Sequence, residues 1–176
     1  ATSCLYFKGG ARGALIQRNR LENCGLGGIM VGFDTSPEFF DLQVNPNYYE
    51  AIDAIVRNNI VRLTDYAGIG LYASLNAKVF NNTLVDTARI GHAALYFGVT
   101  LQDFDPQAGR PANLSPSLLN NIVRQGHDRC LSIRFANELG GLSGLNGAPG
   151  TNYNFYSRNS GLCMFRDARP GASISN

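Results

Sequence analysis

The sequence predicts an all-β fold, a right-handed parallel β-helix of about five to six coils with long loops after one strand. Composition is the first reason, because 20 of the 176 residues are Gly, Trp is absent and only 16% are charged, which favours turns over helices. The second reason is a repeated unit of two short strands in which apolar and polar residues alternate with period two. Such a unit is too small to bury its apolar face alone, so the units must stack on one another.

Three copies of the repeat align without a gap. In each copy, six residues with a central Asn are followed by a second apolar strand, at 16–21 and 29–31, at 56–61 and 69–71, and at 118–123 and 131–133. A fourth copy at 79–84 and 95–97 has three extra residues around 90–92, and a shortened fifth lies at 154–156 and 162–164. Asn59 and Asn82 are 23 residues apart, which is about the length of one coil of a parallel β-helix.

Three insertions interrupt the repeat at the same point. They lie at 33–53, 98–116 and 136–150, and each follows the second strand of its unit. Loops that recur after one strand of a solenoid lie on one edge of it, so we expect these insertions to wall a groove.

Alternation divides the second strand into inward and outward residues. Ile29, Ile69, Leu95, Leu131 and Leu162 are predicted to point inward, as are the residues two positions later. The outward residues form two columns that we expect to face solvent. One column contains Tyr6, Met30, Gly70, Tyr96, Ser132 and Cys163, and the other contains Lys8, Gly32, Tyr72, Gly98, Arg134 and Phe165.

The outward columns suggest a surface for sugars. Aromatic rings offer a face to a sugar ring, and Lys or Arg binds a carboxylate or sulfate. The candidate substrate-binding residues are therefore Tyr6, Tyr72, Tyr96 and Arg134, with Asp34 at the rim. Gly32 and Gly98 would leave gaps between the side chains in which a ligand touches the backbone.

The segments Leu5-Tyr-Phe-Lys8-Gly-Gly, Leu15-Ile-Gln-Arg-Asn19, Glu50-Ala-Ile-Asp53 and Asn58-Asn59-Ile-Val resemble the secreted right-handed β-helix proteins of the pectin-lyase-like superfamily. The resemblance covers nearly the whole chain. It implies a protein that is secreted or extracellular, with the periplasm as a further option. Within that superfamily, Lys8 is similar in position to the catalytic base of the chondroitinase B and alginate lyase family. The sequence departs from that family in the next coil, where an Arg is replaced by Ile29-Met-Val-Gly-Phe33-Asp34.

His92 is the second candidate catalytic residue. It lies among the three extra residues of the fourth copy, just before the second strand, and an imidazole can serve as a general acid or base near neutral pH. Asp103 and Asp105 in the second insertion are carboxylates that would suit hydrolysis instead.

Carboxylates also gather in the first insertion, at Asp34, Glu38, Asp41, Glu50 and Asp53. Hard oxygen ligands on loops can bind Ca²⁺, as in pectate-lyase-like enzymes, but the spacing matches no defined calcium loop. We therefore assign no metal residues and no required cofactor, with Ca²⁺ as an open alternative. In a second interpretation, Glu50 and Asp53 anchor the return of the long loop.

Other polar residues are assigned structural roles. Asn19, Asn59, Asn82 and Asn121 are expected to adopt the left-handed conformation at each corner and to stack their amides. Cys4, Cys24, Cys130 and Cys163 have no metal-site spacing, which leaves one or two disulfides or four buried thiols.

The resulting hypothesis is a secreted, carbohydrate-active β-helix that binds an acidic polysaccharide in the groove and cleaves it if it is an enzyme of the lyase type. The alternative is a non-catalytic structural or adhesive module. A net charge of +2 argues against nucleic-acid binding, and no apolar run is long enough for a membrane span. We expect residues 1–176 to form one domain of a longer chain, with end caps supplied by that chain or by another subunit.

Overall fold

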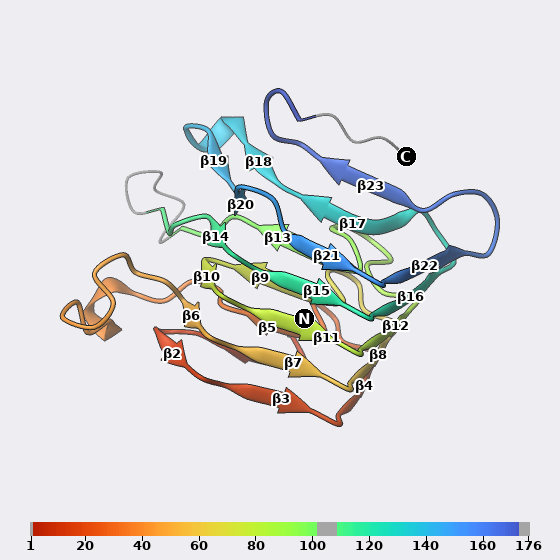
Figure 1. Ribbon diagram of the computed structural model, residues 1–176, viewed down its shortest axis with the longest axis horizontal. Coiled ribbons are helices and arrows are strands. Elements are labelled where there is room, and N and C mark those ends of the chain that lie inside the picture. The colour runs from red at the N-terminus through yellow and green to blue at the C-terminus, as the bar shows by residue number, and fades with distance from the viewer. Residues whose placement is uncertain (1, 102–108, 173–176) are drawn as a thin grey trace.

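Four stacked sheets of parallel strands form this chain in a computed structural model that describes residues 2–101 and 109–172 (Figure 1). Each pass of the chain contributes one strand to each sheet, named A, B, C and D in the order in which the chain meets them. The predicted all-β fold with stacked parallel strands is therefore confirmed.

Sheets A and B carry the strands on either side of the insertions. Sheet A contains β1 (Leu5–Phe7), β5 (Ile29–Val31), β9 (Ile69–Tyr72), β13 (Leu95–Gly98), β17 (Arg129–Ile133) and β23 (Met164–Asp167). Sheet B contains β2 (Ala11–Arg12), β6 (Ala51–Ile52), β10 (Ser74–Leu75), β14 (Asn113–Leu114) and β20 (Leu145–Asn146).

Sheets C and D correspond to the six-residue segments of the sequence repeat. Sheet C contains β3 (Leu15–Gln17), β7 (Ile55–Arg57), β11 (Lys78–Phe80), β15 (Ser117–Leu119) and β21 (Gly150–Asn152). Sheet D contains β4 (Arg20–Glu22), β8 (Ile60–Arg62), β12 (Thr83–Val85), β16 (Ile122–Gln125) and β22 (Phe155–Arg158).

The interior is filled by the residues that the alternation predicts to point inward. Ile29, Ile69 and Leu95 are fully buried in sheet A, in register with one another. Sheets C and D add a central apolar residue from each strand except β21, such as Val79 in β11 and Leu84 in β12. The core is thus a continuous column that runs through the stack.

Two residues were wrongly predicted to point inward, Leu162 and Met164, and Met164 lies opposite Arg129 and outside the core cluster. Leu162 is 79% exposed, because Phe165 lies opposite Leu131 in the register of β17 and β23. A β-bulge between Arg129 and Leu131 accompanies the shift, and the Cys130–Cys163 disulfide holds the chain beside it. Arg166 and Ala168, instead of Cys163 and Phe165, therefore continue the two outward columns on the last strand.

An asparagine ladder joins the coils at the corner between sheets C and D. Each side-chain amide donates to the Oδ1 atom of the Asn in the next coil, with N–O distances of 2.9–3.0 Å from Asn19 through Asn59, Asn82 and Asn121 to Asn154. The same Oδ1 atoms accept the backbone N–H groups of the coil below. The stacked amides were predicted correctly.

The left-handed conformation at this corner belongs to the residue before each ladder Asn. Arg18, Asn58, Asn81, Asn120 and Tyr153 have φ values between 53° and 59°. A single left-handed residue turns the chain sharply between two strands, and this leaves the following Asn free to point inward. The expectation that the ladder residues themselves adopt this conformation was therefore wrong.

Two disulfides stabilise the first and last coils. Cys4–Cys24 joins the segments before β1 and β5, and Cys130–Cys163 joins β17 to the segment before β23. They close loops of 20 and 33 residues, for which loop-closure entropy gives about 3–4 kcal/mol each. The question that the sequence left open is settled in favour of two bridges, Cys4–Cys24 and Cys130–Cys163.

The insertions connect sheet A to sheet B, and the described residues of the first and third insertions project from the same side of the stack, on the left in Figure 1. Their described residues include the short 3₁₀ helices η1 (Pro37–Phe39) and η4 (Asn137–Leu139) and an antiparallel hairpin of β18 (Phe135–Ala136) and β19 (Leu142–Ser143). In the described part of the chain, no helix is long and apolar enough to cross a membrane.

Leu71 provides a test of the inward register. The side chain is fully buried, so we expect Leu71→Ala to leave a cavity between coils and to lower the free energy of unfolding by about 2–5 kcal/mol. Ile60→Ala on the outer face of sheet D, where the side chain is 44% exposed, is the control and should cost under about 1 kcal/mol. Urea unfolding of both variants measures the difference, and equal losses would show that the register is wrong.

Candidate functional site

The outer face of sheet A is covered by its own aromatic side chains. Tyr72 and Tyr96 are only 4% and 5% exposed, and together with Met30 and Ala67 they form a small apolar cluster outside the main core. The expectation that these outward positions face solvent was wrong. The two rings are in tilted contact, with centroids 6.0 Å apart and an interplanar angle of 59°.

Glycines make room for this arrangement. A Cβ atom on Gly98 would lie 2.1 Å from the Tyr72 ring, and one on Gly70 would lie 2.7 Å from it. The space left by Gly98 is therefore filled by Tyr72 instead of being open to a ligand. Gly32, with φ of 86°, has its missing Cβ directed at the backbone oxygen of Tyr72, so this position is also occupied by the neighbouring strand.

A groove of about 370 Å³ lies above this aromatic cluster. Residues from sheet A and from all three insertions line it: Phe33, Asp34, Tyr72, His92, Tyr96, Val99, Thr100, Leu101, Arg134 and Leu139. The predicted position of the insertions beside one groove is confirmed for their described residues. Part of the second insertion, including Asp103 and Asp105, lies outside the described residues.

Five candidate residues from distant parts of the sequence meet at this groove: Asp34, Tyr72, His92, Tyr96 and Arg134. Lys8 and Tyr6 do not line it. The Lys8 ammonium donates to the backbone oxygen of Asp34 and lies 3.9 Å from its Oδ1 atom, and the Tyr6 ring centroid is 6.0 Å from that ammonium. Lys8 thus contacts the groove only through Asp34.

His92 is the centre of the aromatic arrangement. Its ring stacks on Tyr96 with centroids 4.1 Å apart and an interplanar angle of 3°, and it lies 5.0 Å from the Tyr66 ring. The Tyr72 hydroxyl is 3.5 Å from Nδ1 of His92. Burial of the ring, and then the positive charge of Arg134, lower the pKa of His92 to about 4. The imidazole is therefore neutral at pH 7, and His92 is exposed where it lines the groove.

The tyrosines beneath His92 are protonated over the whole physiological range. Burial, and then the neighbouring Tyr96, raise the pKa of Tyr72, and burial also raises the pKa of Tyr96 against the opposing effect of Arg134. Neutral hydroxyls can donate hydrogen bonds, but they are poor proton acceptors. The groove floor is therefore aromatic and uncharged.

Phe33 is a groove residue that the sequence reasoning missed. Its ring packs edge-on against Tyr72, with centroids 5.6 Å apart, and remains 40% exposed. It directly follows the outward column, at the first position of the first insertion. The period-two alternation applies only within a strand, and Phe33 lies after the end of β5, so the alternation did not predict that its side chain lines the groove.

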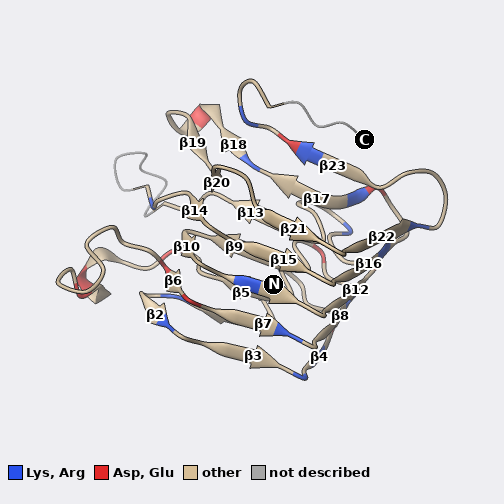
Figure 2. Ribbon diagram, in the orientation of Figure 1, with Lys and Arg blue, Asp and Glu red and all other residues tan. Residues whose placement is uncertain are grey.

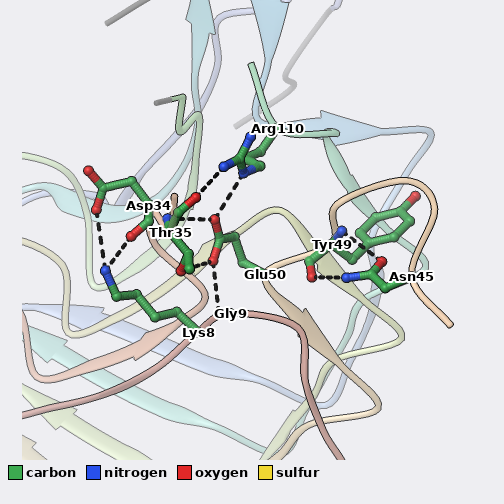
Figure 3. Close-up of polar contacts among 8 residues, drawn as sticks. All are labelled: Lys8, Gly9, Asp34, Thr35, Asn45, Tyr49, Glu50 and Arg110. Carbon is green, nitrogen blue, oxygen red and sulfur yellow. Dashed lines mark hydrogen bonds and ion pairs between the residues drawn. The ribbon is translucent and has the colours of Figure 1, made fainter. Parts of the chain in front are cut away.

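A buried ion pair connects the first two insertions (Figure 3). Glu50 is fully buried, and its carboxylate accepts hydrogen bonds from the Gly9 and Thr35 backbone, the Thr35 hydroxyl and Nε of Arg110 at 2.7–3.1 Å. Arg110 also donates to the backbone oxygen of Thr35. This arrangement agrees with the interpretation of Glu50 as the anchor of the loop.

Aromatic packing completes the anchor. The Arg110 guanidinium lies 5.1 Å and 5.3 Å from the ring centroids of Phe40 and Tyr48, which are themselves in edge contact. Asn45 folds the same insertion by exchanging hydrogen bonds with the backbone of Tyr49, as Figure 3 shows. The buried ion pair of Glu50 and Arg110 thus fixes the two insertions that form the wall of the groove.

The carboxylates of the first insertion point to different partners. Asp34 pairs with Lys8, Glu50 with Arg110 and Asp53 with Arg12, whereas Asp41 accepts the backbone N–H of Gln43. Among the described residues, no three His, Cys, Asp or Glu side chains come together as a metal site.

Charge is sparse over the rest of the fold. Figure 2 shows a mostly tan ribbon in which basic and acidic segments are short and separate. Several of these charges pair locally, such as Arg89 with Asp65 and Arg169 with Asp167. Arg134 pairs with Glu138 at the groove, where both side chains are exposed.

Arg110→Met tests the anchor. Loss of the guanidinium leaves the buried Glu50 carboxylate without its counter-ion, so we expect the free energy of unfolding to fall by about 3–5 kcal/mol. Arg12→Met breaks the exposed pair with Asp53 and should cost under about 1 kcal/mol. Chemical denaturation compares the two variants, and a similar small loss in both would mean that the anchor contributes little.

His92 predicts a pH dependence of stability. In the unfolded chain its pKa is near 6.5, whereas in the folded protein it is about 4, so the unfolded state binds more protons between these values. Stability should therefore fall as the pH decreases from 6.5 to 4. We expect the melting temperature of His92→Gln to decrease less over this range than that of the wild-type protein. Parallel pH profiles for the two proteins would contradict the assignment.

No family model matches this sequence, and no curated protein or solved structure matches it either. The function must therefore be argued from the chemistry of the groove itself.

Proposed function

We propose that this chain is a carbohydrate-active β-helix protein that binds an acidic polysaccharide in the groove along sheet A. The observation that carries the proposal is that exposed aromatic rings, Phe33 and His92, meet the guanidinium of Arg134 in one groove. A sugar ring needs a flat apolar surface, and its carboxylate or sulfate needs a cation beside that surface.

The roles of the groove residues follow from their exposure. Tyr72 and Tyr96 are too buried to offer a free face, so they act as support for Phe33 and His92. Arg134 would bind the anionic group, because its planar fork matches a carboxylate in two-point contact. Asp34 accepts hydrogen bonds from sugar hydroxyls at the rim, while Lys8 holds Asp34 in place. Because Lys8 does not line the groove and its pair with Asp34 is exposed, binding should survive Lys8→Ala.

Cleavage by β-elimination is a second candidate, favoured by the contact between His92 and the Tyr72 hydroxyl. In such a reaction a base removes the proton beside the uronate carboxylate, the bond to the leaving oxygen breaks, and that oxygen takes up a proton. Neutral His92 would accept the first proton and, as the imidazolium, return it to the leaving oxygen, while the buried Tyr72 hydroxyl holds the ring. Because the pKa of His92 is about 4, its basicity is weak, and the geometry supports binding better than cleavage.

A non-catalytic structural or adhesive module remains the alternative. Its support is the pairing of Lys8 with Asp34, which engages the candidate base, together with the lack of a cation in the next coil at Gly32. In this alternative the stack spaces the insertions and presents them to a partner. It differs from the first proposal in having no affinity for acidic sugars.

The finer features of the fold belong to the same proposal. We infer a right-handed β-helix of five to six coils of the pectin-lyase-like type, because crossovers between parallel strands of one sheet are almost always right-handed. The two disulfides favour a secreted, extracellular or periplasmic location. Phe7, Ile16 and Phe165 at the two ends are only partly buried, which favours further cover from a longer chain or another subunit.

The binding test uses defined oligosaccharides. We expect wild-type protein to bind a galacturonate hexamer in calorimetry, and Phe33→Ala combined with Arg134→Gln to reduce the affinity at least about tenfold. Phe39→Ala combined with Arg124→Gln removes one exposed aromatic ring and one exposed Arg outside the groove and is the matched control. Equal affinity in both double variants would exclude the groove as the binding site.

Cleavage is read in the same samples by absorbance of the unsaturated uronate product. Product formation that disappears in His92→Gln would establish the lyase reaction, and binding without product would establish a lectin-like module. If neither galacturonate nor sulfated glycosaminoglycan fragments bind, the structural module is the better description.

A further inference from the structure

A second hollow continues the groove toward the last strand of sheet A. It has a volume of about 310 Å³ and shares His92, Tyr96 and Arg134 with the groove. Ser132 and Arg166 also line it. The two hollows therefore form one path across the sheet, with the stacked pair of His92 and Tyr96 between them.

Arg166 enters this path through the register of the last coil. Ser132 lies opposite both Tyr96 and Arg166, so these three residues form one outward column. Arg134 is two residues beyond Ser132 on the neighbouring strand, which places the Cα atoms of Arg134 and Arg166 roughly 8 Å apart. Two long side chains at this distance can direct their guanidinium groups at one anion.

The charges around the second hollow are mostly positive. Arg129 is held on its wall by hydrogen bonds to the backbone oxygens of Ala88 and Arg89, at 3.1 Å and 3.0 Å. Arg166 takes part in no ion pair among the described residues. Both Arg134 and Arg166 lie close enough to Tyr96 to oppose the rise that burial causes in its pKa. Figure 2 shows the basic and acidic segments of β23 side by side, but the acidic one, Asp167, is paired with Arg169.

Glu138 is the acidic residue that balances Arg134. It lies in η4 of the third insertion, and its carboxylate contacts Arg134 although its side chain is 60% exposed. An exposed ion pair of this kind contributes under about 1 kcal/mol, so an anion that contacts two arginines can displace it. The Glu138 carboxylate thus occupies the position that an acidic ligand would take.

We propose that Arg134 and Arg166, with the Ser132 hydroxyl between them, form an anion subsite for a carboxylate or sulfate group of the glycan, and that Glu138 occupies this subsite until the ligand replaces it. The proposal rests on the glycan-binding function above and adds the chemical group that the site selects. An acidic sugar lies with its ring beside His92 and its anionic group between the two arginines. A neutral sugar makes only the ring contact.

The experiment compares a galacturonate hexamer with its fully methyl-esterified form by calorimetry. Wild-type protein should prefer the acid, and Arg166→Gln should weaken binding of the acid about tenfold while leaving the ester unchanged. Glu138→Gln should strengthen binding of the acid about two- to fivefold, because Arg134 is then released. Damage to the fold would not produce a gain in affinity, so this variant separates the subsite from a structural effect.

Arg124→Gln is the matched control, because it removes an exposed arginine from sheet D. Inorganic sulfate provides a probe that does not depend on sugar binding. At equal ionic strength, sodium sulfate should raise the melting temperature of the wild-type protein above its value in sodium chloride, and by more than it does for Arg166→Gln. Chondroitin sulfate and galacturonate fragments then distinguish a sulfate ligand from a carboxylate ligand.

Two results would overturn the inference. One is that Arg166→Gln behaves like Arg124→Gln with both the acidic hexamer and sulfate, and the other is that Glu138→Gln gives no gain with either. If no oligosaccharide binds but the sulfate effect depends on Arg166, the glycan-binding function fails while the anion subsite stands.

Discussion

Hydrogen bonding between successive coils is the interaction on which the rest of the structure depends. Strands of two to five residues have too few contacts to be stable alone, and each obtains its backbone partners from the coils above and below. The asparagine ladder extends this into the interior, because each buried amide bonds the Asn of the next coil and a backbone oxygen of the coil below, as Asn82 does with Asn121 and Val56. A buried amide without these partners would be costly, so the ladder sets one register for the whole stack.

The fixed register explains which corner of the coil accepts insertions and where the groove forms. Sheets C and D meet at the ladder corner with no room for insertions, whereas the corner between sheets A and B carries all three. Long loops at one corner would be disordered without an anchor. Glu50 and Arg110 supply it from inside the corner, and they connect loops that are 60 residues apart in sequence. The groove wall is therefore part of the cooperative structure of the solenoid.

The chemistry of the groove depends on aromatic packing across the outer face of sheet A. Tyr72 fills the space above Gly70 and Gly98, and Tyr96 supports His92 by stacking. This arrangement keeps the imidazole neutral and leaves an aromatic floor with arginines at one end. Such a surface suits recognition of ring and charge together, and it provides little basicity for proton abstraction. The proposal of glycan binding follows from the aromatic floor of the groove, and the proposal of an anion subsite follows from the arginines at one end.

The sequence by itself determined the all-β class, the repeat, the inward apolar column and the edge that carries the insertions, because these depend on local periodicity that each coil repeats. It also brought Asp34, Tyr72, His92, Tyr96 and Arg134 together as candidates, since they occupy equivalent or neighbouring positions of the repeat. Only the tertiary structure decided that Tyr72 and Tyr96 are buried, since the Tyr72 ring packs over Gly98, which lies 26 residues later on the neighbouring strand. The tertiary structure also placed Arg166 on the outer face of sheet A, because the bulge and disulfide at Cys130 shift the last strand out of the repeat. Local pattern specifies which face a residue occupies, and only contacts between coils specify what covers it.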